Sequence, residues 1–167
     1  MKELLQGRRF GFAPRPFLGQ VAIGLALGAT LLDLMAWGGW GARQTTGLVA
    51  GAYWLTVGTA TLCALALLTG LAEMRDAAEE DSGYVRIDVI AALVATLIFA
   101  ASAVLRALEL SAAAAPPAPF LLSIGGLLLL LVDGVIATAL YAGREWAELD
   151  EEDVEPQRHR RRRTAAR

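Results

Sequence analysis

The sequence has little of what a soluble or disulfide-linked protein needs. Its 167 residues include one cysteine, which excludes an intramolecular disulfide framework. Charged residues make up 19% of the chain, below the roughly 25% that is usual in soluble domains. Hydrophobic residues make up 56% of the chain and are concentrated in four long blocks. This distribution rules out a water-soluble core.

Groups that could carry chemistry are also scarce. The single histidine, His159, lies in the C-terminal tail, so the apolar blocks hold no histidine that could ligate haem or another metal. Cys63 is a lone thiol, which we expect to be a small packing residue. There is no phosphate-binding glycine loop, no metal-spaced Cys/His set and no pairing of a nucleophile with a base. We therefore expect a protein that is not an enzyme and that uses no cofactor.

The four apolar blocks have the length of transmembrane helices. A helix needs about 20 mostly apolar residues to cross the hydrocarbon core of a bilayer. Residues 17–37, 47–71, 88–108 and 119–142 meet that requirement. None of them alternates as the strands of a β-barrel do. Because short connections make successive helices antiparallel neighbours, the sequence predicts an all-α integral membrane four-helix up-down-up-down bundle without a soluble domain, over residues 17–144.

The basic residues predict the orientation, because Lys and Arg accumulate on the cytoplasmic side. With four spans, residues 1–16, the loop between the second and third spans, and the tail lie on one side. That side holds thirteen of the fifteen Lys and Arg, and the other side holds Arg43 and Arg106. We expect a bacterial inner-membrane protein with both termini in the cytoplasm. A signal peptide is a poor alternative, because the first apolar block is too long and contains Asp33.

Small residues predict where the helices meet, since helices in lipid associate through close packing of small side chains and through polar contacts. Gly24 and Gly28 stand one turn apart on the first span, Gly47 and Gly51 on the second, and Gly126 on the fourth. Helical spacing also gives each span a packing stripe of small and polar residues, which on the first span lies nearly opposite the Gly24–Gly28 face. These stripes are Gly19, Ala22, Ala26, Thr30 and Asp33; then Thr56, Thr59, Cys63, Ala66 and Gly70; then Ala92, Ala95, Phe99, Ser102 and Arg106; and finally Gly126, Asp133 and Ala137. The patterns indicate a packed bundle and leave room for a homo-oligomer or a membrane-protein partner.

Three ionisable residues inside the apolar blocks are candidate functional residues, because a charge at mid-membrane costs about 2.5–3.5 kcal/mol on insertion scales. At a rise of about 1.5 Å per residue, Asp33 and Arg106 lie about 24 Å and about 27 Å from the inner ends of their spans. Both then lie near the outer boundary, where they either pair or reach water separately. Asp133 lies inside the inner boundary, where we expect no basic residue of another helix. For Asp133 a hydrogen-bonded structural carboxyl, an oligomer contact and a proton or ion relay stay open.

Residues 145–167 differ sharply from the rest of the chain. Seven acidic residues between positions 145 and 155 are followed by five arginines, Arg158, Arg160, Arg161, Arg162 and Arg163. Blocks of like charge are typical of disordered tails. The arginines suit anionic lipid headgroups at the membrane surface. No nucleic-acid-binding fold accompanies them, so we expect no nucleic-acid partner.

Three stretches of the chain resemble one known family. They are residues 22–25 with 31–34 (AIGL, LLDL), residues 52–55 with 68–73 (AYWL, LTGLAE) and residues 86–88 with 99–106 (RID, FAASAVLR). Together they resemble the bacterial membrane family catalogued as domain of unknown function 2231, over most of residues 17–144. Asp33 and Arg106 fall on motif positions of that family. The resemblance implies a four-helix membrane domain and supplies no activity.

The chain also departs from that family. Members often carry His-Pro at the start of the first helix and a histidine near the start of the third. Residues 17–19 read FLG here and residues 87–88 read ID. Any cofactor that those histidines bind in other members would have lost its ligands in this chain.

Taken together, these features predict a non-enzymatic membrane protein that acts through helix association, as an accessory, scaffold or oligomeric subunit. The alternative is an oligomeric proton- or ion-coupled transporter or channel for small solutes, with Asp133 in its path.

Overall fold

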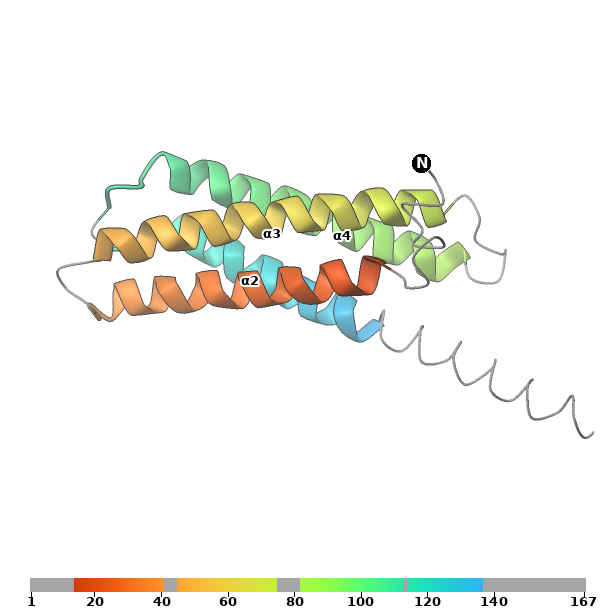
Figure 1. Cartoon of the computed structure of the whole chain (residues 1–167), viewed down its shortest axis with the longest axis horizontal. Coiled ribbons are helices and arrows are strands. Elements are labelled where there is room, and N and C mark those ends of the chain that lie inside the picture. Colours follow the sequence, from red (N-terminus) through yellow and green to blue (C-terminus); the bar gives the residue numbers. More distant parts are fainter. Residues whose placement is uncertain (1–13, 41–44, 75–81, 113, 137–167) are drawn as a thin grey trace, which may run out of the picture. The chain divides into compact units, whose positions relative to one another are not determined.

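The chain is helical throughout the part that the structure describes. The computed structural model describes residues 14–40, 45–74, 82–112 and 114–136. Its helices are α2 (Pro14–Trp37), α3 (Thr45–Glu73), α4 (Ser82–Ala107) and a further helix, Pro117–Ile136, which we call the fourth span (Figure 1). The described residues contain no strand, and all four helices are long and apolar enough to cross a membrane. The predicted all-α class is confirmed.

All four described helices begin before the apolar blocks that predicted them, and the difference is largest for α2 and α4. α2 begins at Pro14, ahead of residue 17, and α4 begins at Ser82, ahead of residue 88. Proline suits the first turn of a helix, because the N–H that it lacks would have no partner there. Apolar composition therefore places the helix ends too far inward, and residues 14–16 belong to a helix. The predicted residues 137–142 of the fourth span lie outside the described residues.

The end of α2 has a defined cap. Gly39 adopts a positive φ of 66°, a conformation that glycine reaches without the penalty of a Cβ. The amide of Trp40 donates to the carbonyl of Met35 at 3.0 Å, and the amide of Gly39 donates to Ala36 at 3.3 Å. These two bonds make a Schellman cap, which satisfies carbonyls that the helix end would leave free. The cap ends α2 at Trp37, where the apolar block also ends.

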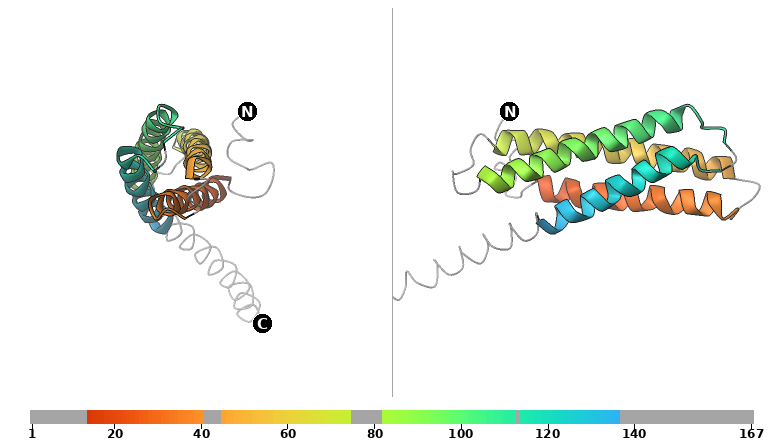
Figure 2. Two further views of the ribbon diagram at one scale, coloured as in Figure 1. Left: turned by 90° about the vertical axis from the view of Figure 1, so that its left-hand side faces the viewer. Right: turned by 180° about the vertical axis from the view of Figure 1, so that it is seen from behind.

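The helices of residues 14–134 enclose one interior. α2 packs against α3, and α3 packs against α4. The fourth span contacts α4 where Ser123 meets Ser102, and it contacts α2 where the Trp37 and Phe120 rings lie 5.3 Å apart. Viewed along the helices, α2 and α4 lie across the interior from each other (Figure 2). A side chain that joins α2 to α4 must therefore cross the core.

The predicted packing stripes fall mainly on buried faces of the helices. All five stripe residues of α3 and all five of α4 are buried. On α2, Ala22, Ala26 and Asp33 are buried, while Gly19 and Thr30 are half-buried. On the fourth span Gly126 is buried and Asp133 half-buried, and Ala137 lies outside the described residues. The rotation of each helix about its axis could thus be predicted from small and polar residues at helical spacing.

The glycines divide into those that face a neighbouring helix and those that do not. A Cβ at Gly28 would lie 3.1 Å from Leu55 Cδ1, and one at Gly51 would lie 3.0 Å from Leu32 Cδ1, so both admit a leucine of the facing helix. A Cβ at Gly126 would lie 2.8 Å from the Phe99 ring. Gly24 and Gly47 have nothing within 4 Å. The prediction that Gly24 and Gly28 form one close-approach face is therefore wrong within a single chain, because only Gly28 faces α3.

The outside of the described helices is strongly apolar. Large side chains that a soluble protein would bury are exposed on every helix, among them Leu31, Trp54, Leu97 and Leu128. The residues fully withdrawn from the surface include charged and hydroxyl side chains, namely Asp33, Thr56, Thr59, Ser102, Arg106 and Ser123. This arrangement inverts the usual distribution of polar residues in a soluble protein.

Candidate functional site

The first of two buried charge clusters, the Arg106 cluster, consists of Asp33, Ser102, Arg106 and Ser123. Arg106 stands in the last turn of α4, and Asp33 stands near the end of α2. Both side chains have 0% exposure. Nη1 of Arg106 donates to Oδ1 of Asp33 at 2.8 Å, and Nη2 donates to Oδ2 of the same carboxylate. The pair is therefore bidentate, the arrangement in which a guanidinium binds a carboxylate most strongly.

Two serines complete this cluster. Nη2 of Arg106 also donates to Ser123 Oγ at 3.1 Å, and Nε donates to Ser102 Oγ at 3.4 Å. The Ser102 hydroxyl donates to the Pro119 carbonyl at 2.8 Å and lies 2.9 Å from Ser123 Oγ. Because the Ser102 hydrogen is engaged with Pro119, Ser123 is the donor between the two hydroxyls. The cluster links α2, α4 and the fourth span.

The charges of the Arg106 cluster are fully matched. One guanidinium meets one carboxylate, and two further N–H groups of the guanidinium reach hydroxyl oxygens. Breaking a buried pair of this kind leaves an uncompensated buried charge, which is why such pairs fix how helices meet. The geometry leaves neither charge free for substrate, so the cluster is suited to architecture.

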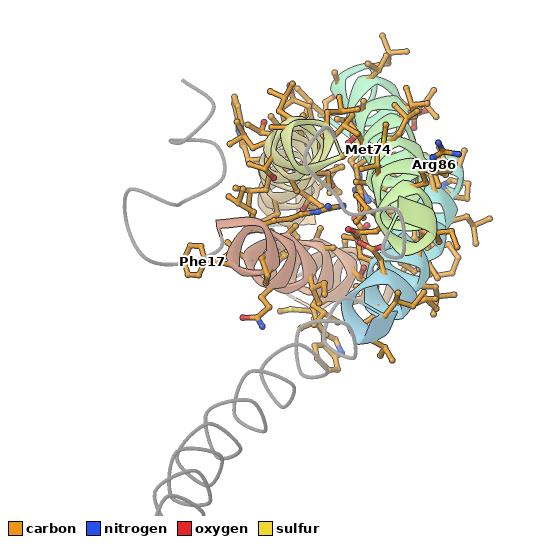
Figure 3. All side chains as sticks on the ribbon, turned by 90° about the vertical axis from the view of Figure 1, so that its right-hand side faces the viewer. Phe17, Met74 and Arg86 are labelled. Atoms are coloured by element: carbon orange, nitrogen blue, oxygen red, sulfur yellow. The ribbon has the colours of Figure 1, made fainter. Side chains whose placement is uncertain are left out.

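The second cluster, the Arg15 cluster, consists of Arg15, Asp88 and Asp133 and lies at the opposite end. Arg15, in the first turn of α2, forms an ion pair with Asp88 of α4, and their side chains are 7% and 13% exposed. A Cβ on Gly70 would lie 2.8 Å from the Arg15 Cζ, so the guanidinium lies against the backbone of α3. Figure 3 views this end, marked by Phe17, Met74 and Arg86, and shows nitrogen- and oxygen-bearing side chains pointing between the helices.

Asp133 joins this cluster from the fourth span. Its carboxyl lies within electrostatic range of Asp88 and of Arg15. Its Oδ1 atom is buried and has no hydrogen-bond partner within the described part of the chain. The prediction that no basic residue of another helix lies at the level of Asp133 is wrong, because Arg15 continues α2 beyond the apolar block and turns into the core.

The sequence predicts the Arg106 cluster more completely than the Arg15 cluster. Asp33 and Arg106 were predicted as candidate partners, and the structure joins them. Arg15 was assigned to the flanking segment and Asp88 to the edge of a span, so their meeting with Asp133 was missed. The available signal was that all three stand at helix ends on one predicted side of the membrane. Ser123 was also missed, although it lies three residues before Gly126 on the same helix face.

The structure tests the other predicted site residues only in part. Gly28, Gly51 and Gly126 lie at helix contacts, and Gly24 and Gly47 do not. The lipid-contact arginines, Arg158 and Arg160 to Arg163, lie outside the described residues. Over residues 14–40, 45–74, 82–112 and 114–136, no group of three His, Cys, Asp or Glu could hold a metal ion.

Comparisons of the chain with protein-family models, with curated proteins and with solved structures found no match. The two clusters and the inverted distribution of polar residues are therefore the basis on which its function is argued.

Proposed function

We propose that the chain is a multi-pass integral membrane protein of the bacterial inner membrane, built as an up-down-up-down four-helix bundle. The observation that supports this most directly is the inverted polarity, with leucines and tryptophans outside and an arginine–aspartate pair fully buried inside. Lipid favours this arrangement, since it solvates apolar side chains and leaves polar groups to find partners in the bundle. The resemblance to domain of unknown function 2231 supports the same architecture and stays a prediction.

The proposal places the Arg15 cluster toward the cytoplasm and the Arg106 cluster toward the opposite side. The excess of Lys and Arg in the flanks of the Arg15 end supports this orientation. Trp37, Trp40 and Trp54 are exposed near the Arg106 end, where tryptophans suit a membrane–water interface. Cysteines introduced at Gln44 and Arg158 test the orientation, because membrane-impermeant thiol reagents should reach them from opposite faces of the cell. Labelling of both from one face contradicts it.

Within the membrane we propose a non-enzymatic role in helix association, as an accessory, scaffold or oligomeric subunit. The supporting observation is that the Asp33 carboxylate and the Arg106 guanidinium bind each other and two serines within the bundle, which links three helices of one chain. Gly24 faces outward with nothing within 4 Å, which leaves a close-approach position on α2 for a helix of another chain. The tail arginines would add contact with anionic lipid headgroups.

Two glycine substitutions test this role. Gly24→Leu should weaken association in mild detergent without unfolding the monomer, because a side chain at Gly24 meets nothing in its own chain. Gly126→Leu should instead unfold the monomer, because its Cβ would lie 2.8 Å from Phe99. Gly125→Leu is the matched control, since it is exposed and also open. Association that survives Gly24→Leu and Gly125→Leu equally well would contradict an interface on α2.

A second function is favoured by one observation, the buried Oδ1 of Asp133, which has no hydrogen-bond partner among the residues that the structure describes. Such a carboxyl suits a proton- or ion-coupled transporter or channel that works as an oligomer. In proteoliposomes, Asp133→Asn should then abolish a proton or ion flux while leaving assembly intact. Under the scaffold function there is no flux to abolish.

A further inference from the structure

α2 and α4 occupy equivalent positions in the bundle. Each contributes one residue to both arginine–aspartate pairs, and in both pairs the partners are 73 residues apart. Because the starts of the helices meet in one pair and their ends in the other, the helices run parallel. Buried residues correspond at the same offset, namely Ala22 to Ala95, Ala26 to Phe99 and Ala29 to Ser102. Since the helices also lie across the interior from each other (Figure 2), an approximate two-fold axis along the bundle relates them.

This approximate symmetry makes α4 a reference for the outer face of α2. Every exposed residue of α4 between positions 90 and 107 is apolar. Between Phe17 and Leu34, α2 exposes one polar side chain, that of Gln20. At the offset of 73, Gln20 corresponds to the exposed Leu93 of α4. The outer face of α2 therefore departs from the lipid-facing pattern of its equivalent helix.

The side chain of Gln20 is poorly suited to lipid. Its carboxamide forms no hydrogen bond with the described part of the chain. Gln20 follows Arg15, the first residue of the apolar span, at a distance of about 7–8 Å along the helix axis. A polar group without a partner is unfavourable in hydrocarbon, whereas glutamine side chains between transmembrane helices hydrogen-bond across the contact. The exposed carboxamide therefore indicates contact with another helix.

The same face suits a second copy of the chain. Gly24 lies one turn beyond Gln20 and has nothing within 4 Å, so a neighbouring backbone can come close. No charged residue is exposed on α2 between Phe17 and Leu34, so two copies meet there without repulsion between like charges. A carboxamide both donates and accepts, so two glutamines satisfy each other. Two copies in one membrane share one orientation, and a two-fold axis then places each residue opposite its own copy.

We propose that the α2 face of Gln20 and Gly24 binds a second copy of this chain, in a two-fold dimer whose Gln20 carboxamides hydrogen-bond to each other. The inference rests on the proposed role as an oligomeric membrane subunit and deepens it, because it names the partner and the polar contact. Leu27 and Leu31 are exposed further along the same face and continue the contact.

Disulfide cross-linking of the full chain in its native membrane tests the face. In a Cys63→Ala background, Gln20→Cys should give a linked dimer on oxidation with copper phenanthroline, because the two-fold contact brings both copies of this position together. Leu93→Cys is the matched control, since it lies at the equivalent position of α4, and it should stay monomeric. Absence of a dimer from Gln20→Cys overturns the proposal, and so does equal linking of Leu93→Cys.

Energy transfer between donor- and acceptor-labelled chains in liposomes tests the polar contact. Gln20→Leu should weaken dimerisation about 3- to 30-fold, the range expected for one hydrogen bond between transmembrane helices. Leu93→Ala should leave it unchanged. Gln20→Leu that dimerises as tightly as the wild type overturns the role of the carboxamide.

A wild-type chain that stays monomeric at every protein-to-lipid ratio overturns the second copy as partner. The scaffold function fails separately, because it requires only that some membrane protein associates with the chain. Co-purification of a different membrane protein with a monomeric chain would therefore overturn this inference and support the scaffold function.

Discussion

The Arg106 cluster and the Arg15 cluster both join α2 to α4 across the core through an arginine–aspartate pair, but they differ in how completely their charges are matched. At the Arg106 end one base meets one acid, and two serines accept two further N–H groups of the guanidinium. At the Arg15 end Arg15 pairs with Asp88 and lies within electrostatic range of a second acid, Asp133, whose buried Oδ1 has no hydrogen-bond partner among the described residues. Among the described residues, the first arrangement matches its charges one to one and the second does not.

The difference predicts which end governs stability. A fully buried ion pair is costly to break, because losing either partner leaves an uncompensated buried charge. The side chains of Arg15 and Asp88 retain 7% and 13% exposure, so water can solvate part of a charge that is left behind. The Arg106 end should therefore govern stability, and changes at the Arg15 end should cost less.

The largest effect is expected from breaking the Arg106 pair on one side. Arg106→Met leaves Asp33 charged and fully buried, so we expect a loss of about 3–5 kcal/mol in unfolding free energy. Asp33→Leu should cost a similar amount. The measurement is unfolding in a denaturing detergent titration, followed by tryptophan fluorescence.

The double variant sharpens this result. Asp33→Leu combined with Arg106→Met replaces the pair by apolar side chains, and such replacements are often neutral in buried ion pairs. We therefore expect the double variant to be more stable than either single variant. If the single variants lose no more unfolding free energy than the double variant, the pair is not buried as described.

At the Arg15 end, Gly70→Ala should act through Arg15. The new Cβ would lie 2.8 Å from the guanidinium carbon, which must then move away from α3 and weaken its pair with Asp88. Overpacking of this kind costs about 1–3 kcal/mol. Gly125→Ala, exposed and without neighbours, is the matched control and should be neutral or slightly stabilising. If Gly70→Ala and Gly125→Ala change the unfolding free energy in detergent equally, the position of the Arg15 side chain does not depend on the absence of a side chain at Gly70.

The sequence predicts more of the Arg106 end than of the Arg15 end, and the reason is physical. Ser102 and Arg106 share one face of α4 at helical spacing, and Asp33 stands at a similar depth, so periodicity and rise per residue bring them together. The meeting of Arg15 with Asp88 and Asp133 depends on how far each helix continues beyond its apolar block. Polar residues at helix ends carry no hydropathy signal, so that extension could not be predicted from composition.

The smallest effect is expected from removing a single uncharged hydrogen bond at the Arg106 end. Trp37 Nε1 donates to the Ala115 carbonyl at 2.9 Å, which ties the end of α2 to the segment before the fourth span. Trp37→Phe keeps an aromatic ring near Phe120 but removes the donor, so we expect a loss of about 0.5–1.5 kcal/mol in detergent unfolding.

Trp54→Phe is the control for this change, because Trp54 is 67% exposed on α3 and its loss should leave bundle stability unchanged. Equal losses in the two variants would mean that tryptophan stabilises this end through the lipid interface and not through the Ala115 bond. A loss of stability confined to Trp37→Phe would show that the Trp37–Ala115 hydrogen bond stabilises the Arg106 end in addition to its ion pair. The two ends would then differ in a hydrogen bond to the backbone as well as in their charged side chains.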